Sequence, residues 1–119
     1  MNNTEKPYDL SMLIEMESEE PGTLVKIIQI FLESIPEVLN EFMTNFHNND
    51  ITSLGSSAHK LKSSIDLLSL TDISILLKKI ELCAKKGENL EEIPKWVQLV
   101  NSSLNEVFVM LKDEIAEKS

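Results

Sequence analysis

The chain has 119 residues and a formal net charge of −9, from 20 acidic residues set against 11 basic ones. This length fits one domain with one hydrophobic core, since single domains commonly have about 100–150 residues, and the hydrophobic share of 42% is ordinary for a folded protein. The acidic balance argues against binding to the phosphate backbone of nucleic acids, and a lone cysteine, Cys83, excludes an internal disulfide framework. We therefore expect residues 1–119 to form a single domain.

In chain order, the first predicted element is a short amphipathic helix over about residues 9–16. A long helix is expected to follow Gly22 and to run to about Asn48, because apolar residues recur there at steps of three and four. Pro36 lies inside that segment and has no amide hydrogen to donate, so we expect a kink or a break at this position. Asp50 has the residue type and the place of an N-cap for the next helix.

The same periodicity predicts a third helix over about residues 51–68 and a fourth helix for which Thr71 is the expected cap. The fourth helix is expected to end over Lys85–Gly87, because lysines suit the last turn and glycine suits the position after it. A last helix is expected to begin near Pro94. Four substantial helices joined by short links predict an all-α fold, an antiparallel up-down four-helix bundle over about residues 20–118, with the short N-terminal helix as an addition.

The segment that carries chemistry is Gly55–Ser64, with the sequence Gly-Ser-Ser-Ala-His-Lys-Leu-Lys-Ser-Ser. On a helix, His59 lies one position after the inward-facing Ala58, about 100° further around the axis, at the edge of the buried stripe. Helical side chains lean toward the N-terminus, which is expected to place the imidazole over Gly55 and Ser56. The sequence therefore predicts an exposed histidine framed by small residues.

The basic charge of this acidic chain is concentrated around the same histidine. Between Lys60 and Lys86 there are six lysines and three acidic residues, whereas the rest of the chain holds five lysines and 17 acidic residues. A cationic surrounding is what an anionic phosphoryl group needs near a nucleophile, although a block of charge is also compatible with an ordinary solvated helix face. The chain has no arginine, so the planar fork that grips phosphate at two points is not available.

Most other chemistries lack the residues that they need. The other histidine, His47, lies in a different segment, and no Cys-x-x-Cys or His-x-x-x-His spacing supplies metal ligands. No serine lies in a Gly-x-Ser-x-Gly turn, and no glycine-rich loop is present to hold a nucleotide. His59 itself therefore remains as a candidate nucleophile. The first residues show no secretory signal pattern, and no apolar run approaches the ~18 residues of a membrane span, so we expect a cytoplasmic protein that binds neither membrane nor nucleic acid.

The segment Ala58–Ser64, Ala-His-Lys-Leu-Lys-Ser-Ser, resembles the Ala-His-x-Leu-Lys-Gly-Ser signature of histidine-containing phosphotransfer (HPt) domains. The fold of that family, a four-helix bundle with a short fifth helix at its N-terminus, agrees with the layout predicted above. The resemblance implies that His59 accepts and donates a phosphoryl group through Nε2. It also implies that Lys62 offsets the charge of the transferred group and that Lys60 assists it.

Glu81 matches a position on the next helix at which related domains place Glu or Gln against Nδ1 of the histidine. The resemblance therefore implies that the Glu81 carboxylate fixes the tautomer of the His59 ring and leaves Nε2 free to attack. The alternative is that Glu81 is a solvated helix residue paired with Lys78 or Lys85, as the spacing along the fourth helix also allows.

Ser63 and Ser69 depart from the family pattern, which usually has glycine at both positions. The first glycine is understood to let the phosphoryl group and the partner approach closely, so the serines leave transfer rate and partner choice open. The leading hypothesis is a phosphocarrier in a phosphorelay, with no ATP site of its own and thus not an independent enzyme. The alternatives are an adaptor that binds receiver or kinase domains without being phosphorylated, and an unrelated helical interaction domain in which His59 is incidental.

The partners that the resemblance implies are the receiver domains of response regulators and a sensor or hybrid histidine kinase. Mg²⁺ is expected on the partner receiver domain, whereas neither a cofactor nor a metal is expected on this chain. We expect a monomer, because the histidine must remain accessible to each partner in turn.

Overall fold

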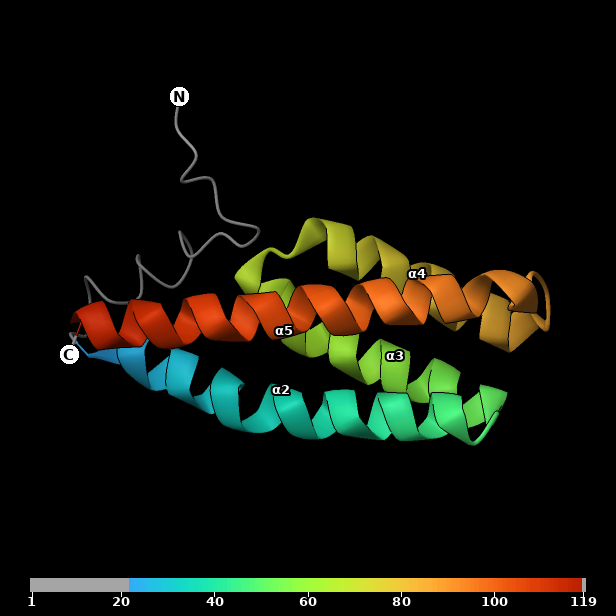
Figure 1. Ribbon diagram of the computed structural model, residues 1–119, viewed down its shortest axis with the longest axis horizontal. Coiled ribbons are helices and arrows are strands. Elements are labelled where there is room, and N and C mark those ends of the chain that lie inside the picture. Colours follow the sequence, from blue (N-terminus) through green and yellow to red (C-terminus); the bar gives the residue numbers. More distant parts are fainter. Residues whose placement is uncertain (1–21, 119) are drawn as a thin grey trace, which may run out of the picture.

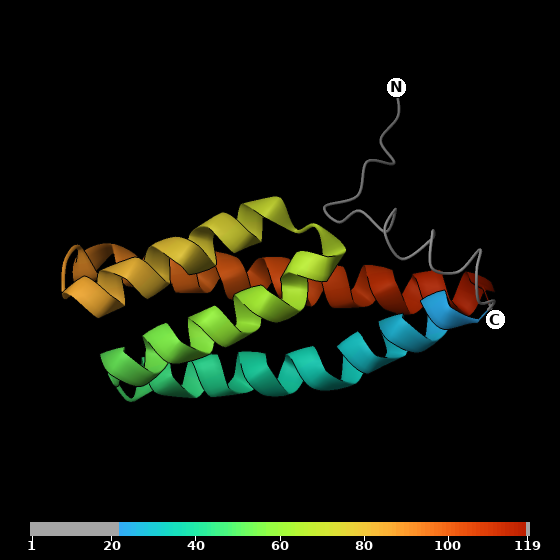
Figure 2. The ribbon, with the colours of Figure 1, turned by 180° about the vertical axis from the view of Figure 1, so that it is seen from behind.

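The computed structural model describes residues 22–118 of the chain. Its α-helices are α2 (Thr23–His47), α3 (Ile51–Ile65), α4 (Thr71–Lys86) and α5 (Ile93–Lys118), with single 3-10 turns η1 (Asp66–Leu68) and η2 (Leu90–Glu92). Figures 1 and 2 show the helices lying lengthwise and alternating in direction, and each packs against the next along the chain, with α5 returning to α2. The predicted antiparallel four-helix bundle is confirmed. The short helix predicted over residues 9–16 lies outside the described residues.

Each helix turns one apolar face toward the interior, because steps of three and four residues form a continuous stripe on a helix of 3.6 residues per turn. The buried apolar residues of α2 and α3 are Leu24, Ile28, Phe31, Ile35, Leu39, Phe42, Leu54, Ala58, Leu61 and Ile65. Those of α4, α5 and the connections are Leu68, Leu70, Ile73, Leu77, Ile80, Ile93, Val97, Val100, Leu104, Val107 and Leu111. Most of the charged residues in the range 22–118 remain on the outer faces, where water solvates them.

Pro36 lies inside α2, and the helix continues through it, so a break at this position is wrong. Figure 2 shows instead that the axis of α2 bends between its blue and its teal part. Proline removes one backbone hydrogen bond, the one to the carbonyl of residue 32. The neighbouring Ile35 and Leu39 are both buried, and each such side chain contributes about 1.5–3 kcal/mol. Packing of this face therefore outweighs the lost bond.

The N-terminus of α3 has the predicted cap, since a side-chain oxygen of Asp50 accepts a hydrogen bond from the backbone nitrogen of Ser53 at 3.2 Å. Thr71 is not the cap of α4, and that prediction is wrong. The capping position is the buried Leu70, which makes no side-chain cap, and Thr71 is the first helical residue. The reason is that the chain turns one residue earlier, at Ser69, which has left-handed backbone angles.

The other helix boundaries lie close to the predicted ones. The predicted third helix ends as an α-helix at Ile65 and tightens into the 3-10 turn that reaches Leu68. Helix α4 ends at Lys86 and is capped by Gly87, whose φ of 70° suits a residue without a side chain. Helix α5 begins at Ile93, which leaves Pro94 in its first turn, where the amide hydrogen that proline lacks would have no helical acceptor.

Candidate functional site

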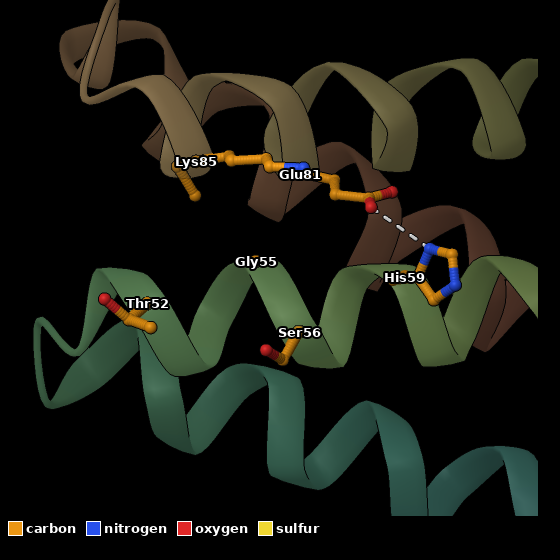
Figure 3. Close-up of a pocket in the computed structure, with 7 residues that line it drawn as sticks. Thr52, Gly55, Ser56, His59, Glu81 and Lys85 are labelled. Carbon is orange, nitrogen blue, oxygen red and sulfur yellow. Dashed lines mark ion pairs between the residues drawn. The ribbon is translucent and has the colours of Figure 1, made fainter.

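The predicted histidine lies in the second half of α3, with its side chain 65% exposed. A groove of about 490 Å³ lies beside it, between α3 and α4 (Figure 3). The residues that line this groove are Thr52, Gly55, Ser56 and His59 from α3, and Glu81, Ala84 and Lys85 from α4. The structure thus places His59 beside the small residues of its own helix and opposite a carboxylate of the next.

The His59 ring is oriented by Glu81. Nδ1 of His59 lies 3.1 Å from Oε2 of Glu81, whose side chain is 22% exposed. A carboxylate can only accept hydrogen bonds, so this contact favours the neutral tautomer that has its proton on Nδ1 and its lone pair on Nε2. Figure 3 shows that the Nε2 edge of the ring faces away from Thr52 and Ser56, along α3 toward its C-terminus. The imidazole therefore does not lie over Gly55 and Ser56 as predicted. It is nevertheless exposed, which the sequence also predicted.

The second carboxylate oxygen of Glu81, Oε1, is buried and has no hydrogen-bond partner among residues 22–118. Lys85 lies one turn further along α4 and lines the same groove, yet no ion pair joins it to Glu81. Of the two predicted alternatives for Glu81, contact with His59 and pairing with a lysine of its own helix, the structure contains the first. The negative charge of Glu81 is thus directed at the histidine.

The two lysines of the motif point away from the groove. Nζ of Lys60 lies 3.1 Å from a carboxylate oxygen of Glu41 on α2. Nζ of Lys62 lies 2.9 Å from Oδ2 of Asp66, one turn further along the chain. Both pairs are at least partly exposed, so each is worth less than about 1 kcal/mol. Neither lysine is fixed against His59, and each would have to leave an acidic partner in order to reach a group bound there.

Asp66 links the end of α3 to the start of α4. Its Oδ2 accepts a hydrogen bond from Lys62, and its Oδ1 accepts one from the hydroxyl of Ser74 at 2.7 Å. Burial raises the pKa of the Asp66 carboxyl, but the hydrogen bonds from Lys62 and Ser74 together with the lysine charge lower it by more. The pKa of Asp66 is therefore below its ordinary value, and the carboxylate remains charged to lower pH than usual.

The rear of α3 is fixed to α2 by a polar contact inside the bundle. The hydroxyl of Ser57 is fully buried and donates to the backbone oxygen of Leu54 at 3.0 Å. Nδ2 of Asn45 donates to the Ser57 hydroxyl at 3.2 Å and to the backbone oxygen of Ser53 at 3.1 Å. These bonds hold the helix that carries His59 from the side opposite the groove.

Two groove residues, Thr52 and Ala84, were not singled out from the sequence as part of a site. For Lys85 a signal existed, because it follows Glu81 by four residues and thus lies on the same face of α4. Nothing within the described range 22–118 brings three or more His, Cys, Asp or Glu side chains together as a metal site would require. Within that range, none of the helices is long and apolar enough to cross a membrane.

Comparison with known proteins gives one family and three similar proteins. The family model of the Hpt domain matches residues 26–117. The phosphorelay intermediate protein rdeA of Dictyostelium discoideum is 23% identical over 108 residues, which are 91% of this chain and 42% of that protein. The chain therefore spans less than half the length of this curated relative.

Two solved structures share the fold. Histidine-containing phosphotransfer protein B (HptB) of Pseudomonas aeruginosa PAO1 is 18% identical, with a TM-score of 0.83 over 96% of this chain and 98% of that one. The HPT domain of a sensor hybrid histidine kinase from Shewanella is 17% identical, with a TM-score of 0.76 over 93% of this chain and 95% of that one. The arrangement of helices is thus common to the three chains.

Proposed function

This chain belongs to the Hpt domain family, and from that premise we propose that it carries a phosphoryl group on Nε2 of His59 in a phosphorelay. The observation that supports the proposal most strongly is the contact between Nδ1 of His59 and Glu81 at 3.1 Å. An exposed ring whose inner nitrogen is bound to a carboxylate has its lone pair on the outer nitrogen, which is what a nucleophile requires. The printed name of the Dictyostelium relative, a phosphorelay intermediate, supports the same assignment.

The proposed donor is an aspartyl phosphate on a receiver domain. The lone pair of His59 Nε2 attacks phosphorus and forms the P–N bond, while the P–O bond to the aspartate breaks and its electron pair leaves with the carboxylate. No proton has to leave the ring during this step. The ring becomes more positive, and the nearby Glu81 carboxylate offsets that charge. Attack by an aspartate of a second receiver reverses the step, because the P–N electron pair returns to Nε2.

Lys62 and Lys60 are proposed to compensate the charge of the bound phosphoryl group. Both side chains are held by exposed acidic partners, Asp66 and Glu41. An exposed pair of this kind is worth less than about 1 kcal/mol, so a doubly charged phosphoryl group on His59, which is one turn from Lys62 and one residue from Lys60, competes effectively for both lysines. The lysines would thus move toward His59 only when it is phosphorylated.

The proposed partners are receiver domains and a sensor or hybrid histidine kinase, and the HPT domain from a hybrid kinase that shares this fold supports that proposal. Mg²⁺ on the receiver would supply most of the charge neutralisation during transfer. In this proposal the chain contributes the nucleophile, its orientation and a docking surface, and thus acts as a carrier and not as an independent enzyme.

The test is transfer from a receiver domain that has been phosphorylated by a small-molecule donor, in the presence of Mg²⁺. Wild type is compared with His59→Gln and with His47→Gln, which removes the exposed histidine at the end of α2. We expect acid-labile, base-stable label on wild type and on His47→Gln and none on His59→Gln. Binding of a receiver to wild type without any transfer would overturn the carrier proposal and indicate an adaptor.

A further inference from the structure

The helices that carry His59 and Glu81 approach each other closely at Gly55 and Ala84. A Cβ atom built on Gly55 would lie 3.1 Å from Cβ of Ala84 and 3.8 Å from the backbone oxygen of Glu81. Carbon atoms in ordinary contact are about 3.5–4.0 Å apart, so α3 and α4 fit around a hydrogen at position 55, whereas a methyl group there would require the Ala84 side of the contact to move by a few tenths of an ångström. Gly55 lies one turn before His59 on α3 (Figure 3). Ala84 lies about one turn after Glu81 on α4.

We propose that Gly55 and Ala84 are positioning residues, whose small size sets the helix spacing at which Glu81 can hold Nδ1 of His59. This inference rests on the proposed function of His59 and deepens it, because it names what determines the orientation of the nucleophile. It concerns the tautomer of the ring, which is a property of the unphosphorylated chain and can be measured without any partner.

The contact of the Glu81 carboxylate with His59 depends on the spacing of α3 and α4, because no second hydrogen bond from the described residues fixes this carboxylate. Oε2 lies 3.1 Å from Nδ1 of His59, and Oε1 has no hydrogen-bond partner among residues 22–118. Hydrogen bonds from N–H to oxygen span about 2.7–3.2 Å, so the present distance is already near the long end. We expect a methyl group at position 55 to displace Ala84, and the turn of α4 that carries Glu81, by a few tenths of an ångström. A displacement of that size along the contact would lengthen the present 3.1 Å beyond this range.

Loss of the contact would change which ring nitrogen carries the proton. With Glu81 in place, the neutral His59 ring has its proton on Nδ1 and its lone pair on Nε2. Without that acceptor, the proton is shared between the two nitrogens, and a smaller fraction of the rings presents a lone pair at Nε2. Removing a group that orients a histidine typically costs about 10- to 100-fold in metal sites, and we expect a loss of roughly tenfold in transfer to His59.

The experiment uses the full chain with ¹⁵N-labelled histidines, and NMR of the ring nitrogens reports which nitrogen is protonated. Gly55→Ala is expected to replace the Nδ1–H signals of His59 by those of a mixture, as Glu81→Ala should also do. The exchange variant Gly55→Ala/Ala84→Gly moves the methyl group from α4 to α3 and is expected to restore the wild-type signals. Gly87→Ala is the matched control, because its φ of 70° makes alanine strained while nothing lies within 4 Å of the added atom. It should lower stability and leave the tautomer unchanged.

Wild-type ring signals in a folded Gly55→Ala would overturn the proposal, and so would an exchange variant that fails to restore them. If Gly55→Ala does not fold, the exchange variant decides: the Nδ1–H tautomer supports the proposal, and a mixture contradicts it. A wild-type chain that takes no phosphoryl group from any receiver would instead overturn the proposed function, and the ring signals would still decide the positioning role.

Discussion

Ser63 and Ser69 occupy two positions at which HPt domains usually have glycine, and the structure gives them opposite backbone conformations. Ser63 lies inside α3, where its hydroxyl donates to the backbone oxygen of His59 at 3.1 Å. Ser69 follows η1 with φ 54° and ψ 39°, in the left-handed region. The same replacement, serine by glycine, should therefore change the free energy of unfolding in opposite directions at the two sites.

The magnitudes follow from the two conformations. A residue with a side chain is about 1–2 kcal/mol less stable at left-handed than at right-handed backbone angles, and glycine avoids this strain. Glycine also has more conformational freedom in the unfolded chain, which lowers the free energy of unfolding by about 0.4–1 kcal/mol. Ser69→Gly should thus stabilise the fold by roughly 0.5–1 kcal/mol. Glycine inside a helix is about 0.5 kcal/mol less favourable than an ordinary residue such as serine, so Ser63→Gly should destabilise by roughly that amount.

Urea unfolding followed by circular dichroism measures both changes, and Ser69→Ala separates the backbone effect from the loss of the hydroxyl. Alanine retains Cβ, so Ser69→Ala should leave the free energy of unfolding within about 0.5 kcal/mol of wild type. Equal signs for the two glycine variants would refute the backbone argument. So would an alanine at position 69 that stabilises as much as glycine does.

One interaction within the bundle and two at its surface give further predictions. Because the pKa of Asp66 is lowered, its charge stabilises the fold above its ordinary pKa of about 3.9 and ceases to do so as the pH falls through the lowered value. Urea midpoints of Asp66→Asn should therefore vary less than those of wild type below about pH 4. Asn45→Ala removes two hydrogen bonds to α3 and leaves the buried Ser57 hydroxyl without that donor. It should lower the free energy of unfolding, measured with urea, by about 1–2 kcal/mol. A decrease no larger than that of the exposed control variant Asn40→Ala would contradict this prediction. Lys60→Ala should cost less than about 1 kcal/mol, because its ion pair is exposed, and a larger loss in thermal unfolding would refute the assignment.

The fold was predictable because each helix repeats one signal many times. Apolar steps of three and four residues mark the whole of α2 and α5, so single exceptions did not disturb the assignment of four helices. The two wrong predictions, a break at Pro36 and a cap at Thr71, relied on the preference of a single residue, which the surrounding structure overrode. Pro36 costs one hydrogen bond, but the buried residues around it keep α2 continuous. Thr71 is a residue type that commonly caps helices, but the chain turns at the left-handed Ser69, so that Leu70 takes the capping position and Thr71 is already helical.

The site was predictable in part. The motif identified His59, the wider family resemblance identified Glu81 on the next helix, and both residues line the groove. The directions of Lys60 and Lys62 were not predictable, because they depend on acidic partners brought close by folding and by the next helical turn. The close approach of Gly55 to α4 depends on how two helices pack, so it could not be predicted from the sequence pattern of one helix.

The contact between His59 and Glu81 joins two helices and involves no loop, which has an evolutionary consequence. In many proteins the functional residues lie on loops, which vary in sequence more than the helices and strands that they connect. The functional site and the fold can then change separately. In the function proposed here, the packing contact between α3 and α4 sets the position of the His59 ring, so a substitution there affects the proposed nucleophile as well as the fold. Natural selection for faithful signalling should therefore act directly on the packing of this helical hairpin, while the turns at the ends of the bundle remain free to change in length and composition.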